Sequence, residues 1–219
     1  PIIPESSPWE AIKISGKFLN GNWYLFLISS SIRVIKSNGS DDMVPPRTKA
    51  SLSNISNKLK SPFENGKTFK ENSLIKSKYF SKKTGLICLA DDSGLEVDAL
   101  NGEPGVYSAR YAGDNASDEE NLSKLLKDME KHNNRKANFC CAMVFIRSYE
   151  DPNPIIIERR WHGEILRKPI GSNGFGYDPI FYLKEYDCSS AQLDPKTKNN
   201  ISHRGLALSD LLTEILLIE

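Results

Sequence analysis

Short apolar runs along the chain predict buried β-strands. Residues 23–28 and 139–146 are apolar throughout. Residues 155–161 begin with three isoleucines and follow a segment, 151–154, that consists of Asp, Pro and Asn. Apolar runs of this length, bounded by turn-forming residues, are typical of strands. We therefore expect 139–146 and 155–161 to pair around the turn at 151–154.

A further short strand is predicted at 86–90, where the residues are again apolar. It ends on Asp91-Asp92-Ser93-Gly94, and each of these residue types favours turns. After them, apolar residues alternate with polar ones up to residue 99. We therefore expect a turn at 91–94 and a second strand that leaves it.

Apolar residues at helical spacing predict three helices. Thr68 with Glu71, and Ser117 with Glu120, have the spacing of a capping box, which marks the first turn of a helix. A last helix is expected after Ser202. The expected apolar stripes are Leu74, Ile75 and Tyr79 in the first helix, with Lys76 pointing away, Leu122, Leu125, Leu126 and Met129 in the second, and Leu206, Leu208, Leu211, Leu212, Ile215 and Leu216 in the last.

Strands and helices in this order predict an α/β protein, with functional residues at strand ends and helix starts. We expect one domain over 23–219, in which 37–60 is an irregular connection rich in Ser, Asn, Pro and Lys. Residues 1–22 show no clear periodicity and are left as an uncertain N-terminal segment.

Composition narrows the function classes. A formal net charge of +1 gives no overall attraction to nucleic acid or to a membrane surface. No apolar run approaches the ~20 residues of a membrane span, and we find no signal-peptide pattern. The four cysteines form no C-x-x-C pair, which favours free thiols in a reducing compartment. A cytoplasmic protein is the expectation.

Two acidic features suit a metal ion. Side chains of Asp91 and Asp92 point opposite ways if the backbone there is extended, so one carboxylate can face a cleft while the other supports it. Such a carboxylate can bind Mg²⁺ or activate a water molecule. Glu64, in the loop before the first helix, is a candidate for a second oxygen ligand. The competing interpretations are an ordinary turn at 91–94 and a solvent-exposed Glu64.

Two further features suit an anionic aromatic ligand. Residues 174–181 read Gly-Phe-Gly-Tyr-Asp-Pro-Ile-Phe, a glycine-rich turn in which an aromatic ring can stack on a base and Asp178 can accept from its edge. His203 and Arg204 follow the Ser202 cap at a helix start, where the dipole favours negative charge. Lys198 adds a point charge for phosphate. The alternatives are a structural turn and a capped helix with two solvated residues.

Five ordered motifs between about residues 60 and 207 resemble the inosine triphosphate pyrophosphatase family, also called the XTP/dITP diphosphatases. They are Glu-Asn-Gly-Lys-Thr-Phe-Lys-Glu-Asn at 64–72, Asp-Asp-Ser-Gly-Leu at 91–95, Pro-Gly-Val-Tyr-Ser-Ala-Arg-Tyr at 104–111, Phe-Gly-Tyr-Asp-Pro at 175–179 and Ser-His-Arg-Gly at 202–205. A chance match of all five in this order is very improbable.

The resemblance implies a fold and an activity. The fold would be the Maf/Ham1-like α/β form: an elongated mixed β-sheet with flanking helices in two lobes around a central nucleotide cleft. The activity would be Mg²⁺-dependent hydrolysis of ITP, dITP and XTP to monophosphate and pyrophosphate, which cleanses the nucleotide pool. A homodimer is also implied.

The resemblance assigns roles residue by residue. Asp92 matches the general base and metal ligand, and Glu64 the other metal ligand. The residues expected to bind substrate are Lys76 and Ser93 on the triphosphate, Phe175, Gly176 and Tyr177 in the stacking motif, and Asp178, Lys198, His203 and Arg204 on the base.

The family's first motif, Thr/Ser-x-Asn-x-x-Lys, is altered here. Counting back from Glu64 places Ser31 and Lys36 at its ends, but Arg33 replaces the Asn. Two alternatives therefore stay open: a nucleotide-binding homologue with impaired turnover, and a Maf-type pyrophosphatase for other modified nucleotides. The motifs at 175–179 and 202–205 count against the second.

Overall fold

A seven-stranded sheet forms the centre of the molecule, and each strand is hydrogen-bonded to the next one in the sequence. The computed structural model describes residues 16–19, 22–27 and 61–217. The strands are β1 (Gly16–Leu19), β2 (Asn22–Leu27), β3 (Ile87–Val97), β4 (Lys136–Ile146), β5 (Ile155–Ile165), β6 (Phe181–Leu183) and β7 (Cys188–Ser189). The α/β class is confirmed. The pairings between these strands are antiparallel, where a mixed sheet was expected.

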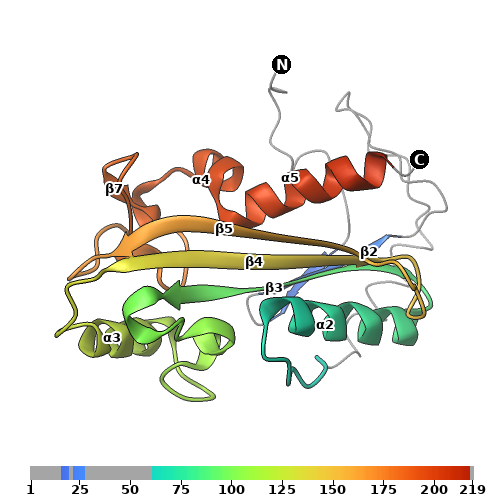
Figure 1. The fold of residues 1–219 in the computed structure, drawn as a ribbon, viewed down its shortest axis with the longest axis horizontal. Coiled ribbons are helices and arrows are strands. Elements are labelled where there is room, and N and C mark those ends of the chain that lie inside the picture. Colours follow the sequence, from blue (N-terminus) through green and yellow to red (C-terminus); the bar gives the residue numbers. More distant parts are fainter. Residues whose placement is uncertain (1–15, 20–21, 28–60, 218–219) are drawn as a thin grey trace.

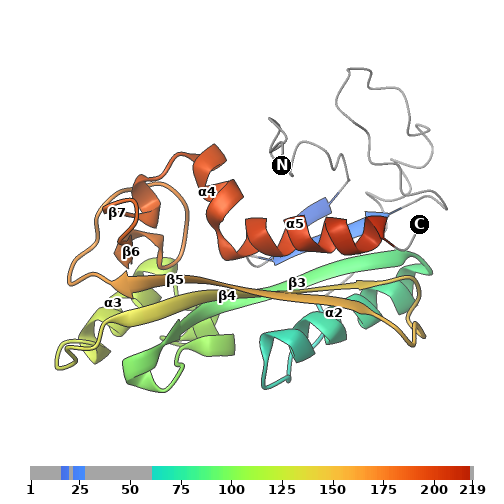
Figure 2. The same ribbon diagram turned by 45° about the horizontal axis from the view of Figure 1, so that its top comes forward.

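Helices cover both faces of the sheet. They are α2 (Phe69–Thr84), α3 (Asp118–Asp128), α4 (Pro195–Ile201) and α5 (His203–Leu216). Both ribbon views place α5 on one face of the long strands β3, β4 and β5, and α2 on the other (Figures 1 and 2). Short 3₁₀ segments connect the rest: η1 (Asp98–Leu100), η2 (Gly105–Arg110), η3 (Asp178–Ile180) and η4 (Ser190–Gln192).

The predicted strands at 23–28, 139–146 and 155–161 are confirmed as β2, β4 and β5. Phe145 pairs with Ile155, so β4 and β5 form the expected hairpin around 151–154. The other apolar run, 86–90, lies at the start of β3.

The predicted turn at 91–94 is wrong, because β3 continues through it. Asp92 pairs with Ala142 and Gly94 with Cys140 on β4. A continuous partner strand therefore overrides the local turn preference of these residues. Gly94 instead lets η2 pack closely against β3. A Cβ at this position would lie 2.4 Å from Ser108 Oγ of η2 and 2.5 Å from the Gly105 carbonyl oxygen.

Strand alternation decides which helix each side chain meets. On β4, Cys141, Met143 and Phe145 share a core cluster with α5, whereas Val144 and Ile146 share one with α2. The same rule holds on β3, where the even residues Cys88 and Ala90 pack on the α2 side and the odd residues Ile87 and Leu89 on the α5 side. Asp91 and Asp92, which continue this strand, must therefore face opposite helices.

Helix α2 buries a polar face. The predicted apolar residues Leu74, Ile75 and Tyr79 are only partly buried, whereas Lys76 is fully buried rather than pointing away. Three polar residues on this side of the helix, Asn72, Ser73 and Lys76, bond to β3; Ser73 Oγ, for example, donates to the Ala90 carbonyl at 2.8 Å. This face carries the candidate site.

The predicted helix starts are confirmed. Thr68 Oγ1 accepts from the Glu71 amide, although the Glu71 carboxylate accepts from Lys67 and not from Thr68. Ser117 and Glu120 form a complete capping box, and Ser202 caps α5. Two of the expected apolar residues of α5, Leu206 and Leu216, are exposed.

The four cysteines are free thiols, as expected. In the part of the chain that the structure describes, no helix is both long and apolar enough to cross a membrane.

Candidate active site

A buried carboxylate on β3 forms one half of the site. Asp92 is 6% exposed and faces α2. Its Oδ1 accepts from Lys76 Nζ at 2.6 Å, and its Oδ2 accepts from Asn72 Nδ2 at 3.2 Å. Asn72 and Lys76 are one helical turn apart on α2, so a single helix face holds both oxygens in place.

Lys76 gathers a second carboxylate into the same cluster. Its Nζ lies 3.0 Å from Glu64 Oε2 and also donates to the backbone carbonyl of Asp91 at 3.0 Å. Glu64 and Asp92, which are distant in sequence, thus converge on one fully buried ammonium group. We call Glu64, Lys76 and Asp92 the acidic cluster.

Burial and charge act in opposite directions on the pKa values of this cluster. Burial raises the pKa of Asp92 to about 6, with a further contribution from Glu64, although Lys76 opposes the shift. Burial would lower the pKa of Lys76, but the carboxylates of Asp92, Glu64 and Asp91 outweigh it and raise the pKa. Lys76 is therefore a cation at neutral pH, and Asp92 is a stronger base than an ordinary Asp.

The acidic cluster fits a magnesium ion. Two carboxylate oxygens already converge on one cation, the Lys76 ammonium. Mg²⁺ in nucleotide enzymes is usually held by one or two carboxylates, with water and substrate phosphates as the other ligands. Among the residues that the structure describes, no group of three or more His, Cys, Asp and Glu side chains could hold a metal. Of these described residues, Glu64 and Asp92 have oxygens placed for a metal, by their convergence on Lys76, and magnesium binding by them stays a prediction.

Asp91 faces the other way and meets the start of α5. Its Oδ2 accepts from Arg204 Nε at 2.9 Å, and Cys141 Sγ lies 3.9 Å from the same oxygen. The two adjacent carboxylates of β3 thus have different partners on opposite faces. The alternative of a solvated Arg204 is wrong, because its side chain is only 12% exposed and forms an ion pair with Asp91.

Asp178 organises the glycine-rich turn. One oxygen, Oδ2, accepts from the Phe175 amide at 2.8 Å and from Lys198 Nζ, and Oδ1 accepts from Ser190 Oγ at 2.6 Å. Gly174 has a φ of +81°, and a Cβ there would lie 2.1 Å from Asp178 Oδ2. Glycine is therefore required at this position, both for the left-handed backbone and for the space.

An exposed aromatic ring stands beside two cations. Phe175 is 52% exposed, although it lies in a turn held by buried groups. Lys198 Nζ lies 5.5 Å from the centre of its ring, and Arg204 Cζ lies 5.7 Å from it. This arrangement offers a purine both a stacking surface and nearby donors.

His203 lies at the same helix start but is buried. Its ring stacks on Phe139, with centroids 5.0 Å apart and planes at 9°. No described residue bonds to its buried Nδ1. Burial, together with the positive charges of Arg204 and Lys198, lowers its pKa well below 6.5, so the imidazole is neutral at pH 7. It is therefore not the solvated residue of the alternative interpretation.

The family model for the Ham1 family matches residues 36–214. The chain belongs to the Ham1 family. The dITP/XTP pyrophosphatase of Idiomarina loihiensis is 54% identical over 154 residues, covering 69% of this chain and 76% of that protein. The dITP/XTP pyrophosphatase of Vibrio cholerae is 53% identical over the same length, covering 69% and 77%.

Solved Ham1 structures share the fold. The HAM1 protein from Coxiella burnetii is 42% identical, with a TM-score of 0.70, and the match covers 78% of this chain and 94% of that one. The Staphylococcus aureus Ham1 protein is 41% identical, with a TM-score of 0.71, and covers 77% and 86%.

Three further predicted residues of this Ham1 chain lie on β3 or in the glycine-rich turn at 174–181. Ser93 is partly buried on the Asp91 side of β3. The Gly176 amide donates to Asp118 Oδ2 at 2.7 Å, and the buried Tyr177 donates its hydroxyl to the Ser108 carbonyl at 2.9 Å. Gly176 and Tyr177 thus fix the turn, and their contact with substrate stays a prediction. Ser31 and Lys36 lie outside the described residues.

Asn72 is a site residue that sequence reasoning missed. Its Oδ1 accepts from the Gly66 amide at 2.8 Å while its Nδ2 donates to Asp92, so it joins the Glu64 loop to β3. The available signal was its position four residues before Lys76, which puts both on one helix face.

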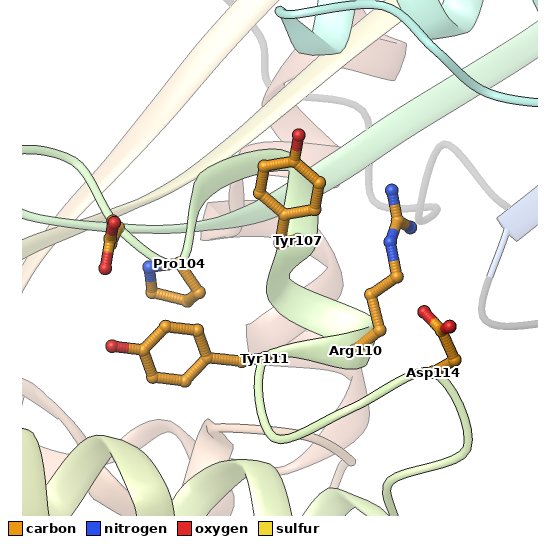
Figure 3. Close-up of a pocket in the computed structure, with 6 residues that line it drawn as sticks. Pro104, Tyr107, Arg110, Tyr111 and Asp114 are labelled. Atoms are coloured by element: carbon orange, nitrogen blue, oxygen red, sulfur yellow. The ribbon is translucent and has the colours of Figure 1, made fainter.

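A separate cavity of about 320 Å³ lies beside η2 (Figure 3). Figure 3 shows Tyr107 and Arg110 extending from this segment, and the Arg110 guanidinium lies 5.0 Å from the Tyr107 ring centre. The cavity is lined by Glu103, Pro104, Tyr107, Arg110, Tyr111 and Asp114. None of the predicted site residues lines it.

Proposed function

We propose that this Ham1-family protein hydrolyses deaminated purine nucleoside triphosphates, namely ITP, dITP and XTP, to the monophosphate and pyrophosphate. One observation carries the proposal: Asp91 and Asp92 are adjacent on β3, and they connect the acidic cluster on one face with Arg204 and the Phe175 ring on the other. One nucleotide can therefore bind with its triphosphate tail at the acidic cluster and its base at Arg204 and Phe175. The names of the curated relatives support the same substrate class.

The acidic cluster supplies the hydrolytic chemistry in this proposal. Asp92 accepts a proton from the attacking water, and its raised pKa suits a general base near neutral pH. Lys76 holds the Asp92 carboxylate in position and provides positive charge for the triphosphate. A magnesium ion bound by Glu64 and Asp92 would neutralise charge on the phosphate oxygens.

His203 and Arg204, at the start of α5, distinguish keto-purines from adenine in this proposal. Hypoxanthine and xanthine carry a 6-keto acceptor, which suits donors from His203 and Arg204. Adenine carries a 6-amino donor at that place, so a buried donor would lose its bond and keep its desolvation cost, about 1–3 kcal/mol per group. The buried Nδ1 of His203, which no described residue satisfies, supports this role.

Pyrophosphate release from ITP, XTP, dITP, ATP and dTTP, measured with and without Mg²⁺, tests the proposal. We expect release from the three deaminated purine nucleotides with Mg²⁺, and much less from ATP and dTTP. Tight ITP binding without release would instead indicate a binding protein, and a preference for dTTP would indicate a Maf-type activity. Light scattering in the same buffer tests the predicted homodimer.

A further inference from the structure

The Asp91–Arg204 ion pair links β3 to the start of α5, two elements that have separate roles in the proposed reaction. Asp91 is 3% exposed, and the Arg204 side chain is 12% exposed. The bond runs from Nε to Oδ2 at 2.9 Å, while the guanidinium carbon lies 5.7 Å from the centre of the Phe175 ring. Arg204 therefore spans from β3 to the exposed aromatic ring.

The start of a helix does not favour a cation. Arg204 is the second residue of α5, and the N-terminus of a helix is the positive end of its dipole. Burial also opposes the charged form, yet the charge of Asp91 raises the pKa of Arg204 above its ordinary value. Asp91 is thus the counter-charge that makes a buried guanidinium tolerable here.

A buried ion pair is better suited to fixing the orientation of its side chains than to stabilising the fold. Burying two charges costs desolvation that their attraction only partly returns, so a buried ion pair is weak evidence for stability. The use of Nε has a geometric consequence, since the guanidinium is planar and one bonded edge sets the direction of the whole group.

We propose that Asp91 is a positioning residue for purine selectivity: it holds Arg204 against the Phe175 ring and contacts no substrate itself. This inference rests on the proposed function and deepens it. Adjacent carboxylates then have separable roles, in which Asp92 serves turnover and Asp91 serves base discrimination. The selectivity of the enzyme depends on the face of β3 that is turned away from the acidic cluster.

Steady-state kinetics of Asp91→Asn tests this. Loss of the charge removes the ion pair that orients the Nε edge of Arg204, so we expect the ITP/ATP ratio of kcat/KM to fall about tenfold, mainly through a higher KM for ITP, with ATP little affected. In a double-mutant cycle with Arg204→Gln, the two changes should be strongly non-additive. An unchanged ratio, or additive effects, would overturn the inference.

Asp151→Asn is the matched control. Asp151 is also buried and paired with an arginine, Arg147, but it lies in the β4–β5 connection. We expect it to lower stability without changing the ITP/ATP ratio. A comparable fall in the ratio would mean that any lost Asp–Arg pair has this effect, and would overturn the assignment.

A measurement on the wild-type protein covers the case in which Asp91→Asn does not fold. The Nε–Hε resonance of Arg204, assigned with Arg204→Lys, should exchange slowly with water and shift on addition of IMP but not AMP. Fast exchange, or no shift with IMP, would contradict the inference. Wild-type enzyme that hydrolyses ITP no better than ATP would end the proposed function as well, whereas an intact preference with unaffected Asp91 variants would end only this inference.

Discussion

The two halves of the site differ in how completely their charged and polar groups are paired within the protein. In the acidic cluster, the carboxylates of Glu64 and Asp92 are neutralised by Lys76, and Asn72 adds a further donor. In the other half, the Phe175 ring is half exposed and the buried Nδ1 of His203 is bound by no described residue. The first half is preorganised for charge; in the second, the proposed function assigns the missing Nδ1 contact to a ligand.

The largest expected effect comes from removing the base of the preorganised half. Asp92→Asn keeps the shape of the side chain, but it cannot accept a proton, and its amide group must face one of the two donors, Lys76 or Asn72. We expect kcat for ITP to fall about 10²–10⁴-fold. The thermal unfolding temperature should also fall, because Lys76 loses one counter-charge, but the protein should still fold, since Glu64 and the Asp91 carbonyl continue to bind the Lys76 ammonium. The measurement is pyrophosphate release at saturating ITP. Retention of most of the activity would remove Asp92 from the role of base.

Removing the central cation of the same half should affect folding. Lys76→Met leaves the buried Asp92 without its counter-charge, and breaking such a pair costs about 3–5 kcal/mol of unfolding free energy. The control is Lys124→Met, which breaks the more exposed Lys124–Asp128 pair, at 2.6 Å, and should cost about 0–1 kcal/mol. Urea denaturation gives both values. Equal losses would mean that the acidic cluster is not a buried charge network.

A mutation at Phe175, in the other half, should change the affinity for the ligand but not the unfolding free energy. Phe175→Ala removes an exposed ring, so we expect the unfolding free energy to change by less than about 0.5 kcal/mol. Loss of base stacking should weaken IMP binding by about 1–3 kcal/mol. Calorimetry with IMP and urea denaturation provide the two numbers. A large loss of stability with unchanged affinity would show Phe175 to be a structural residue.

The buried imidazole predicts a pH dependence of stability. The pKa of His203 is lower in the folded protein than in the unfolded chain, so the unfolded state binds the extra proton as pH falls below about 6.5. The protein should therefore lose up to about 1.4 kcal/mol per pH unit between that point and the folded pKa. His203→Phe should flatten this slope. An identical slope in the variant, from urea denaturation at pH 7.5 to 5, would contradict the assignment.

Sequence reasoning succeeded where local signals and tertiary structure agree. The Ser117–Glu120 cap and the β4–β5 hairpin are both local patterns, and both are confirmed. Glu64 and Asp92, to which the motifs assign one metal, meet at Lys76, and their roles stay predictions.

Sequence reasoning failed where the buried side chains are polar. Hydrophobicity placed Lys76 on the outside of α2, although its ammonium is buried because two carboxylates and a carbonyl surround it. The turn predicted at 91–94 failed for a related reason, since β4 supplies backbone partners that no local preference reveals. The Asp91–Arg204 pair joins residues far apart in the chain, and no spacing rule predicts it.

The ITP/ATP ratio of kcat/KM for Arg204→Ala, measured beside Asp92→Asn, tests most directly whether one face of β3 serves chemistry and the other reads the base. We predict that Arg204→Ala narrows the ratio about tenfold or more, because a donor to the 6-keto group is lost, while turnover of ATP persists. Asp92→Asn should lower kcat/KM for ITP and for ATP by the same factor. A ratio unchanged by Arg204→Ala would contradict this division of roles.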